Sequence, residues 1–181
     1  LSISAIIMFV AFIIVFSEGM SGKITGILMG LGGIGVLIAI VTSGYRMKRF
    51  ISFINPWKYA TDEGYQLVHS LYAIGTGGLF GVGLGNSKQK ALYMPEPHND
   101  FIFAIICEEL GLIGAIIVIS VFLVLIVAGI NVAMRAKDKY GRLLATGIVS
   151  VIAVQVVINI AVVTGSMPVT GVPLPFISYG G

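Results

Sequence analysis

The chain of 181 residues is 57% hydrophobic and only 10% charged, with a mean hydropathy of +1.02 and a formal net charge of +3. Soluble domains carry about 25% charged residues, so this composition excludes an ordinary soluble protein and predicts one that is embedded in a membrane. The few charges gather at the edges of apolar segments, which favours contact with lipid headgroups or phosphates and argues against a nucleic-acid partner.

Four apolar segments predict an all-α fold, a polytopic membrane helix bundle with spans at about residues 1–16, 24–43, 101–134 and 143–164. A helix that crosses a bilayer needs roughly 20 apolar residues, a length that the first segment does not reach. Because the chain begins without Met and ends on two glycines, we expect an internal piece of a larger membrane protein.

The connections between these spans predict the orientation. The short connection 135–142 carries four Lys or Arg residues, so the positive-inside rule places it in the cytoplasm. The long loop 45–100 and the tail 165–181 then lie outside the cell. Six Lys or Arg residues in the long loop argue against this orientation.

Two short helices are predicted within the long loop, because apolar residues recur at helical spacing over residues 47–54 and again over residues 67–72. Asn55 and Pro56 should end the first helix. In the second helix, Ser70 is expected to face away from the apolar stripe. Both helices suit the headgroup plane of a membrane, and the alternative is that they are lids that pack on the rest of the protein.

A glycine-rich segment, GTGGLFGVGLGNSKQK, occupies residues 75–90. Glycine lets the backbone approach a ligand closely and present N–H groups to an anion. The sequence contains neither of the common glycine-rich nucleotide motifs, which argues against a nucleotide site. Lys88 and Lys90 can hold a phosphate as point charges, and the alternative is a flexible loop with its lysines in solvent.

A polar cluster stands before the third span, and two more acids follow inside that span; the residues are Glu96, His98, Asn99, Asp100, Glu108 and Glu109. An acid inside a membrane segment is by default a functional hypothesis. Asp100 beside His98 can serve as a general base or as a ligand of a divalent metal, or it can simply cap the helix. On an ideal helix Glu108 lies about 80° round from Asp100, and Glu109 about 180°. Asp100 and Glu108 can therefore share one wall, while Glu109 faces a partner helix.

The fourth span and the tail also carry polar or helix-breaking residues. Gln155 and Asn159 lie on one face of the span, where hydrogen bonding between helices is the commoner role. Three prolines in the tail prevent a straight helix. Apolar, non-helical backbone is tolerated at membrane depth only against protein or a cavity, so the tail is predicted to be a re-entrant segment that lines a site.

Five motifs together resemble the SEDS family (shape, elongation, division and sporulation), which includes FtsW, RodA and SpoVE. They are NPW at 55–57, GYQ at 64–66, GLGNSKQK at 83–90, PEPHNDFIFAI followed by EELG within 95–111, and PVTGVPLPFISYGG at 168–181. They follow in order over nearly the whole chain, and GLGNS with QK is more similar to the division and sporulation branch. The family has about ten spans, of which this chain resembles four.

The resemblance implies a peptidoglycan glycosyltransferase of the bacterial plasma membrane, active at the outer face. Such an enzyme polymerises lipid II and works with a class B penicillin-binding protein, a transpeptidase. The acid of the family's H-x-D-F motif falls on Asp100 and is taken as catalytic. In this sequence Asn99 occupies the middle position, where many members have Thr. Expected substrate contacts are Arg46, Lys88, Lys90, Glu96, His98 and Glu108. A divalent cation, Mg or Mn, is a further expectation, with Asp100 as its ligand.

Two other functions fit the same features. A flippase for lipid-linked sugars also has polar groups within its spans and a re-entrant segment. A non-catalytic scaffold that recruits division enzymes predicts that acid-to-amide substitutions are silent. Intramembrane aspartyl proteolysis is disfavoured because the sequence has no GxGD motif.

Overall fold

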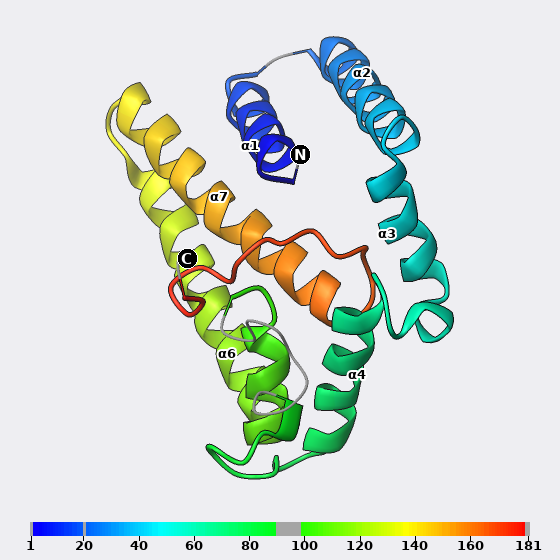
Figure 1. The fold of residues 1–181 in the computed structure, drawn as a ribbon. Coiled ribbons are helices and arrows are strands. Elements are labelled where there is room, and N and C mark those ends of the chain that lie inside the picture. The colour runs from blue at the N-terminus through cyan, green and yellow to red at the C-terminus, as the bar shows by residue number, and fades with distance from the viewer. Residues whose placement is uncertain (1, 20, 90–98, 180–181) are drawn as a thin grey trace. The chain divides into compact units, whose positions relative to one another are not determined.

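The computed structural model describes residues 2–19, 21–89 and 99–179. All the regular structure in these residues is helical (Figure 1), which confirms the all-α prediction. The elements in chain order are α1 (Ser2–Ser17), α2 (Gly22–Val41), α3 (Gly44–Ile54), the 3-10 helix η1 (Pro56–Tyr59), α4 (Tyr65–Gly77), α6 (Ile102–Arg135) and α7 (Lys139–Val163). As predicted, α3 ends immediately before Asn55 and Pro56.

Within the described residues, three helices are long and apolar enough to cross a membrane: the segment Gly22–Ala39 of α2, the 34-residue α6 and the 25-residue α7. The apolar α1 has 16 residues and is shorter than a typical span. Many large apolar side chains on α2 are exposed, including Ile27, Leu31 and Leu37. Such a surface fits lipid tails or further helices, as expected of a multi-pass membrane protein.

The chain divides into two compact units. The first unit contains Leu1–Met47 and Leu125–Val154, and the second contains Lys48–Val124 and Gln155–Gly181. In the first unit, Glu18 forms ion pairs with Lys139 and Arg142 and so ties the turn after α1 to the start of α7. The hydrogen bond from Lys139 and its positive charge hold the pKa of Glu18 below its ordinary value, although partial burial opposes this.

The second unit has its core around α4, the start of α6 and the tail. Helix α4 buries Leu67 and Val68 together with Ser70, which is fully inaccessible to solvent. The expectation that Ser70 faces away is therefore wrong. Its hydroxyl donates to the carbonyl of Val163 at the C-terminal end of α7 (2.7 Å), where carbonyls lack partners within the helix. This packing favours the lid interpretation for α4.

Helix α6 is not continuous, contrary to the single long helix that the sequence predicts. Gly111 has φ 67° and ψ −163°, which breaks the helix within its first third. The backbone groups freed at the break are satisfied by the glycine-rich segment. Val82 N donates to Glu108 O (2.9 Å) and Gly83 N to Glu109 O (3.0 Å), whereas Leu112 N donates to Gly78 O (2.9 Å) and Ile113 N to Leu79 O (3.3 Å). Four hydrogen bonds therefore replace those that the break removes from the helix.

The glycines of this segment are required by its close approach to α6. A Cβ at Gly81 would overlap the carbonyl oxygen of Glu109, and one at Gly77 would overlap that of Cys107. A Cβ at Gly111 would meet the backbone of Gly81 and Leu79. The sequence predicts that these glycines let the backbone approach a ligand. In the structure, these three permit backbone-to-backbone packing against the broken helix.

Candidate functional site

Asp100 lies in the turn that precedes α6, and its backbone is held by a residue from α7. The side-chain nitrogen of Asn159 donates to the carbonyl of Asp100 (2.8 Å) and also to the carbonyl of Val172 in the tail (2.7 Å). Asn159 is only 1% exposed. One buried amide therefore joins the segment that carries the predicted catalytic acid to the tail.

The tail is non-helical, as its prolines predict, and it borders the carboxylate of Asp100. A Cβ at Gly171, which has φ +68°, would lie 3.2 Å from Asp100 Oδ2. A second side chain, Ser178, also connects the tail to this turn. Its Oγ donates to the carbonyl of Asn99 (2.7 Å) and accepts a hydrogen bond from Leu174 N (2.7 Å). Leu174 is fully buried, so the tail is packed against protein. Its predicted position within the membrane stays a prediction.

Glu108 is buried, at 2% exposure, and its carboxylate binds the glycine-rich segment. Ser87 Oγ donates to Glu108 Oε2, and the backbone N–H of Lys88 donates to Oε1 (3.2 Å). The next residue, Gln89, is hydrogen-bonded to His69 Nδ1 of α4 (2.7 Å). The segment 87–89 is thus anchored on both sides of Lys88, whose side chain is exposed.

The other predicted site residues fall in different places. Arg46 belongs to the first unit, where its guanidinium donates to the carbonyl of Ala39 (2.8 Å). Lys90, Glu96 and His98 lie outside the described residues. The structure therefore groups Lys88 with Glu108, and it surrounds Asp100 with residues of α7 and the tail.

Glu109 follows Glu108 but has different surroundings. Its Oε1 atom is buried and has no hydrogen-bond partner within the described part of the chain. An unpaired buried carboxylate oxygen is costly. The expected contact of Glu109 with a partner helix stays a prediction.

The expected divalent cation requires a group of side chains that can act as its ligands. Among residues 2–19, 21–89 and 99–179, no group of three or more His, Cys, Asp or Glu side chains is arranged to hold a metal ion. Asp100 has oxygen ligands suited to a hard cation, but the described residues form no group of three or more such side chains that includes it. The divalent cation stays a prediction.

Several residues around Asp100 were not identified as site residues from the sequence. The sequence predicts only contacts between helices for Asn159, and it gives no signal for Ser178 or Gly171 within the tail. Arg49 of α3 also binds the tail, through the carbonyl of Val169 (3.2 Å). The polar amide of Asn159 within an apolar part of α7 is a sequence signal for a buried hydrogen bond, but its partners lie 13 and 59 residues away in the chain.

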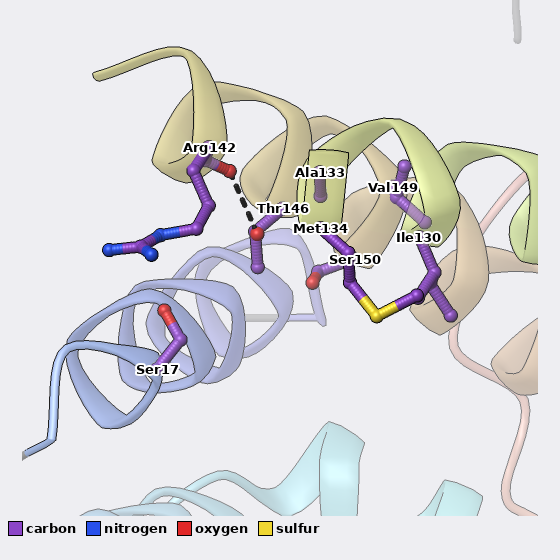
Figure 2. Close-up of a pocket in the computed structure, with 8 residues that line it drawn as sticks. All are labelled: Ser17, Ile130, Ala133, Met134, Arg142, Thr146, Val149 and Ser150. Atoms are coloured by element: carbon purple, nitrogen blue, oxygen red, sulfur yellow. Dashed lines mark hydrogen bonds between the residues drawn. The ribbon is translucent and has the colours of Figure 1, made fainter. Parts of the chain in front are cut away.

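A separate hollow of about 260 Å³ lies in the first unit (Figure 2). Its wall is mostly apolar, with Arg142 at one side, whose backbone carbonyl accepts a hydrogen bond from Thr146 (2.9 Å). The lining residues are Ser17, Ile130, Ala133, Met134, Arg142, Thr146, Val149 and Ser150. None of them is a predicted site residue.

Comparison with known proteins adds family information to this geometry. The model of the FtsW/RodA/SpoVE family, described as "Cell cycle protein", matches residues 1–181. The chain is 53% identical over 156 residues to stage V sporulation protein E of Bacillus subtilis (strain 168), covering 86% of this chain and 43% of that protein. It is 45% identical over 174 residues to a probable peptidoglycan glycosyltransferase FtsW of Geobacter sp. (strain M18), covering 95% and 47%.

A solved structure also resembles this chain, with a TM-score of 0.77 and 26% sequence identity over 99% of this chain and 50% of the other. It comes from work titled "Structural coordination of polymerization and crosslinking by a peptidoglycan synthase complex". The chain spans about half the length of the curated relatives it matches.

Proposed function

This chain belongs to the FtsW/RodA/SpoVE family of cell cycle proteins, and from that premise we propose that the whole protein is a peptidoglycan glycosyltransferase. Its proposed reaction is the polymerisation of lipid II into glycan strands during cell division or sporulation. The observation that carries the proposal is the position of Asp100. Its backbone carbonyl accepts a hydrogen bond from Asn159 of α7, and its carboxylate is bordered by Gly171 of the tail. The relatives named above support the reaction class.

In the proposed reaction, Asp100 acts as a general base. The hydroxyl of the acceptor sugar attacks the anomeric carbon of the donor, and its proton passes to the carboxylate of Asp100. A new C–O bond forms to the acceptor, and the C–O bond to the polyprenyl diphosphate breaks. A buried frame that holds the base in one position favours this step, because proximity and orientation lower the barrier to proton transfer.

The departing diphosphate needs positive charge. Among the described residues, Lys88 is the candidate to supply this charge. Its backbone N–H donates to Glu108, and its side chain is exposed. Glu108 supports this segment in our proposal, in place of the direct substrate contact expected from the sequence. Lys90 and Arg46 stay as further proposed contacts. A divalent cation at Asp100 also stays a proposal, which depletion and re-addition of Mg²⁺ or Mn²⁺ would test.

The proposed setting is the outer face of the bacterial plasma membrane, with the prenyl chains held in lipid between helices. The proposed partner is a class B penicillin-binding protein. Support comes from the similar solved structure, whose title describes polymerization and crosslinking by one complex.

Substitution of Asp100 by Asn tests the proposal in the purified whole protein with its partner. With detergent-dispersed lipid II as substrate, the wild type is expected to form polymer and Asp100→Asn to lose at least about 100-fold in rate. Asp62→Asn is the matched control, since it makes the same chemical change in the loop between η1 and α4, and it should retain full activity.

Four outcomes separate the alternatives. Polymer formation without a bilayer excludes a flippase as the sole function, and wild-type rates from Asp100→Asn would remove Asp100 from catalysis. If the wild type forms no polymer but moves lipid II across vesicle membranes, the protein is a transporter. If it does neither and both Asp variants support division equally, the scaffold function is correct.

A further inference from the structure

Asn159 is a buried amide on the apolar helix α7, and its two known contacts define its orientation. Both partners of its side-chain nitrogen, Asp100 O and Val172 O, are carbonyl oxygens that only accept hydrogen bonds. The atom that faces them must therefore be the NH2 group. The other amide atom, Oδ1, is buried and has no hydrogen-bond partner among the described residues. Asn159 thus contributes as a double donor.

The two carbonyls belong to the two segments that surround the carboxylate of Asp100. One is the peptide of Asp100 itself, and the other follows Gly171, whose position borders Asp100 Oδ2. Ser178 makes a parallel connection from the tail to the carbonyl of Asn99. Together, the two side chains hold consecutive carbonyls, of Asn99 and Asp100. Rotation of this turn would change the direction in which the carboxylate points.

We propose that Asn159 is a positioning residue that fixes the Asp100 carboxylate for proton transfer, an inference that rests on the proposed glycosyl transfer. Asn159 does not contact the substrate, because it is 1% exposed. It acts through the backbone of Asp100 and through the tail. Its loss should therefore lower kcat and leave KM for lipid II nearly unchanged, since the sugar and diphosphate contacts are made by other residues.

Two variants of Asn159 separate hydrogen bonding from packing. Asn159→Asp keeps the size and shape of the side chain but, when ionised, places an oxygen against two carbonyl oxygens. Asn159→Leu removes the donors and keeps comparable bulk. Both are expected to lower kcat about 100-fold, the effect of a displacement of about 1 Å at a catalytic group. The matched control is Gln155→Leu, the same class of change one turn earlier on α7, which should stay within about twofold of wild type.

The hydrogen bond from Ser178 to the carbonyl of Asn99 provides an independent test. Ser178→Ala removes the donor to Asn99 O and is expected to lower kcat about tenfold, because Asn159 still holds the adjacent carbonyl. The double variant Asn159→Leu with Ser178→Ala should lose less than the product of the two single effects, since both residues restrain one turn.

The measurements are kcat and KM for detergent-dispersed lipid II, together with the unfolding temperature of the whole protein. A fall in kcat at unchanged KM and unfolding temperature, absent from Gln155→Leu, supports the inference. Wild-type kcat in both Asn159 variants would overturn it while leaving the proposed function intact. A fall in kcat that matches the fraction of unfolded protein would also overturn it and make Asn159 purely structural. If the wild-type protein itself forms no polymer, it is the proposed function that fails.

Discussion

Replacement of Gly111 by alanine is expected to destabilise the second unit, because the helix break at this residue admits no side chain. The backbone has φ 67° and ψ −163°, a region that essentially only glycine occupies and that costs other residues about 1–3 kcal/mol. In addition, a Cβ would lie 2.6 Å from both the carbonyl carbon and the carbonyl oxygen of Leu79. Real Cβ atoms do not tolerate such distances, so the backbone has to move.

The movement would disturb the hydrogen bonds that join the glycine-rich segment to α6. Four such bonds cross the break, and each contributes about 0.5–1.5 kcal/mol. Loss of even two of them, together with the backbone strain, gives a destabilisation of about 2–6 kcal/mol. For a domain of this size that loss lowers the unfolding temperature by about 4 °C or more.

The assay is thermal unfolding of the whole protein in detergent, with two glycine variants as controls. Gly75→Ala places a methyl group inside α4 where nothing lies within 4 Å, so it should be neutral or stabilising by up to about 1 kcal/mol. Gly85→Ala also has open space but a φ of +78°, so it isolates backbone strain, at about 1–2 kcal/mol. Equal unfolding temperatures for Gly111→Ala and Gly75→Ala would show that our account of the break is incorrect.

Two further predictions concern carboxylates. Glu108→Gln should lower stability by about 1–3 kcal/mol, because a neutral amide forms weaker hydrogen bonds with Ser87 and with the N–H of Lys88 than a carboxylate does; thermal unfolding measures this. The pKa of Glu18 is lowered, chiefly by its hydrogen bond from Lys139, from an ordinary value of 4.5. Its contribution to stability is therefore full above that value and lost as the pH falls through the lowered one, so Glu18→Gln should flatten the decline of unfolding temperature below about pH 4.5.

Both predictions have internal controls. Glu63→Gln removes a carboxylate that lies 4.0 Å from Lys48 Nζ and is partly exposed, and it should change stability by less than about 1 kcal/mol. A Glu108→Gln variant as stable as Glu63→Gln would show that the buried contacts contribute nothing. An unchanged acid decline in Glu18→Gln would assign the pH dependence to other groups.

The sequence predicted the helical elements well because their signals are local. Long apolar runs identified the segments that became α2, α6 and α7, and Asn55 with Pro56 marked the end of α3. The prolines of the tail correctly excluded a helix there. Asp100 was found from its neighbours in the chain and from a family motif, and its catalytic role stays a prediction.

Errors arose where distant segments meet. The orientation of Ser70 was wrong because its partner is a carbonyl at the end of α7, 93 residues later. The break at Gly111 was missed because a single glycine in an apolar helix does not reveal whether another segment supplies hydrogen bonds. Those bonds come from residues 78–83.

Residue types alone determined that this chain forms apolar helices joined by polar and glycine-rich connections, because burial preference and backbone freedom are properties of each residue and its near neighbours. Only the tertiary structure decided that Gly77, Gly81 and Gly111 serve backbone packing, that Glu108 anchors Ser87, and that Asn159 holds the peptide of Asp100. These contacts depend on which buried polar groups come within hydrogen-bond distance after folding, which no local pattern encodes.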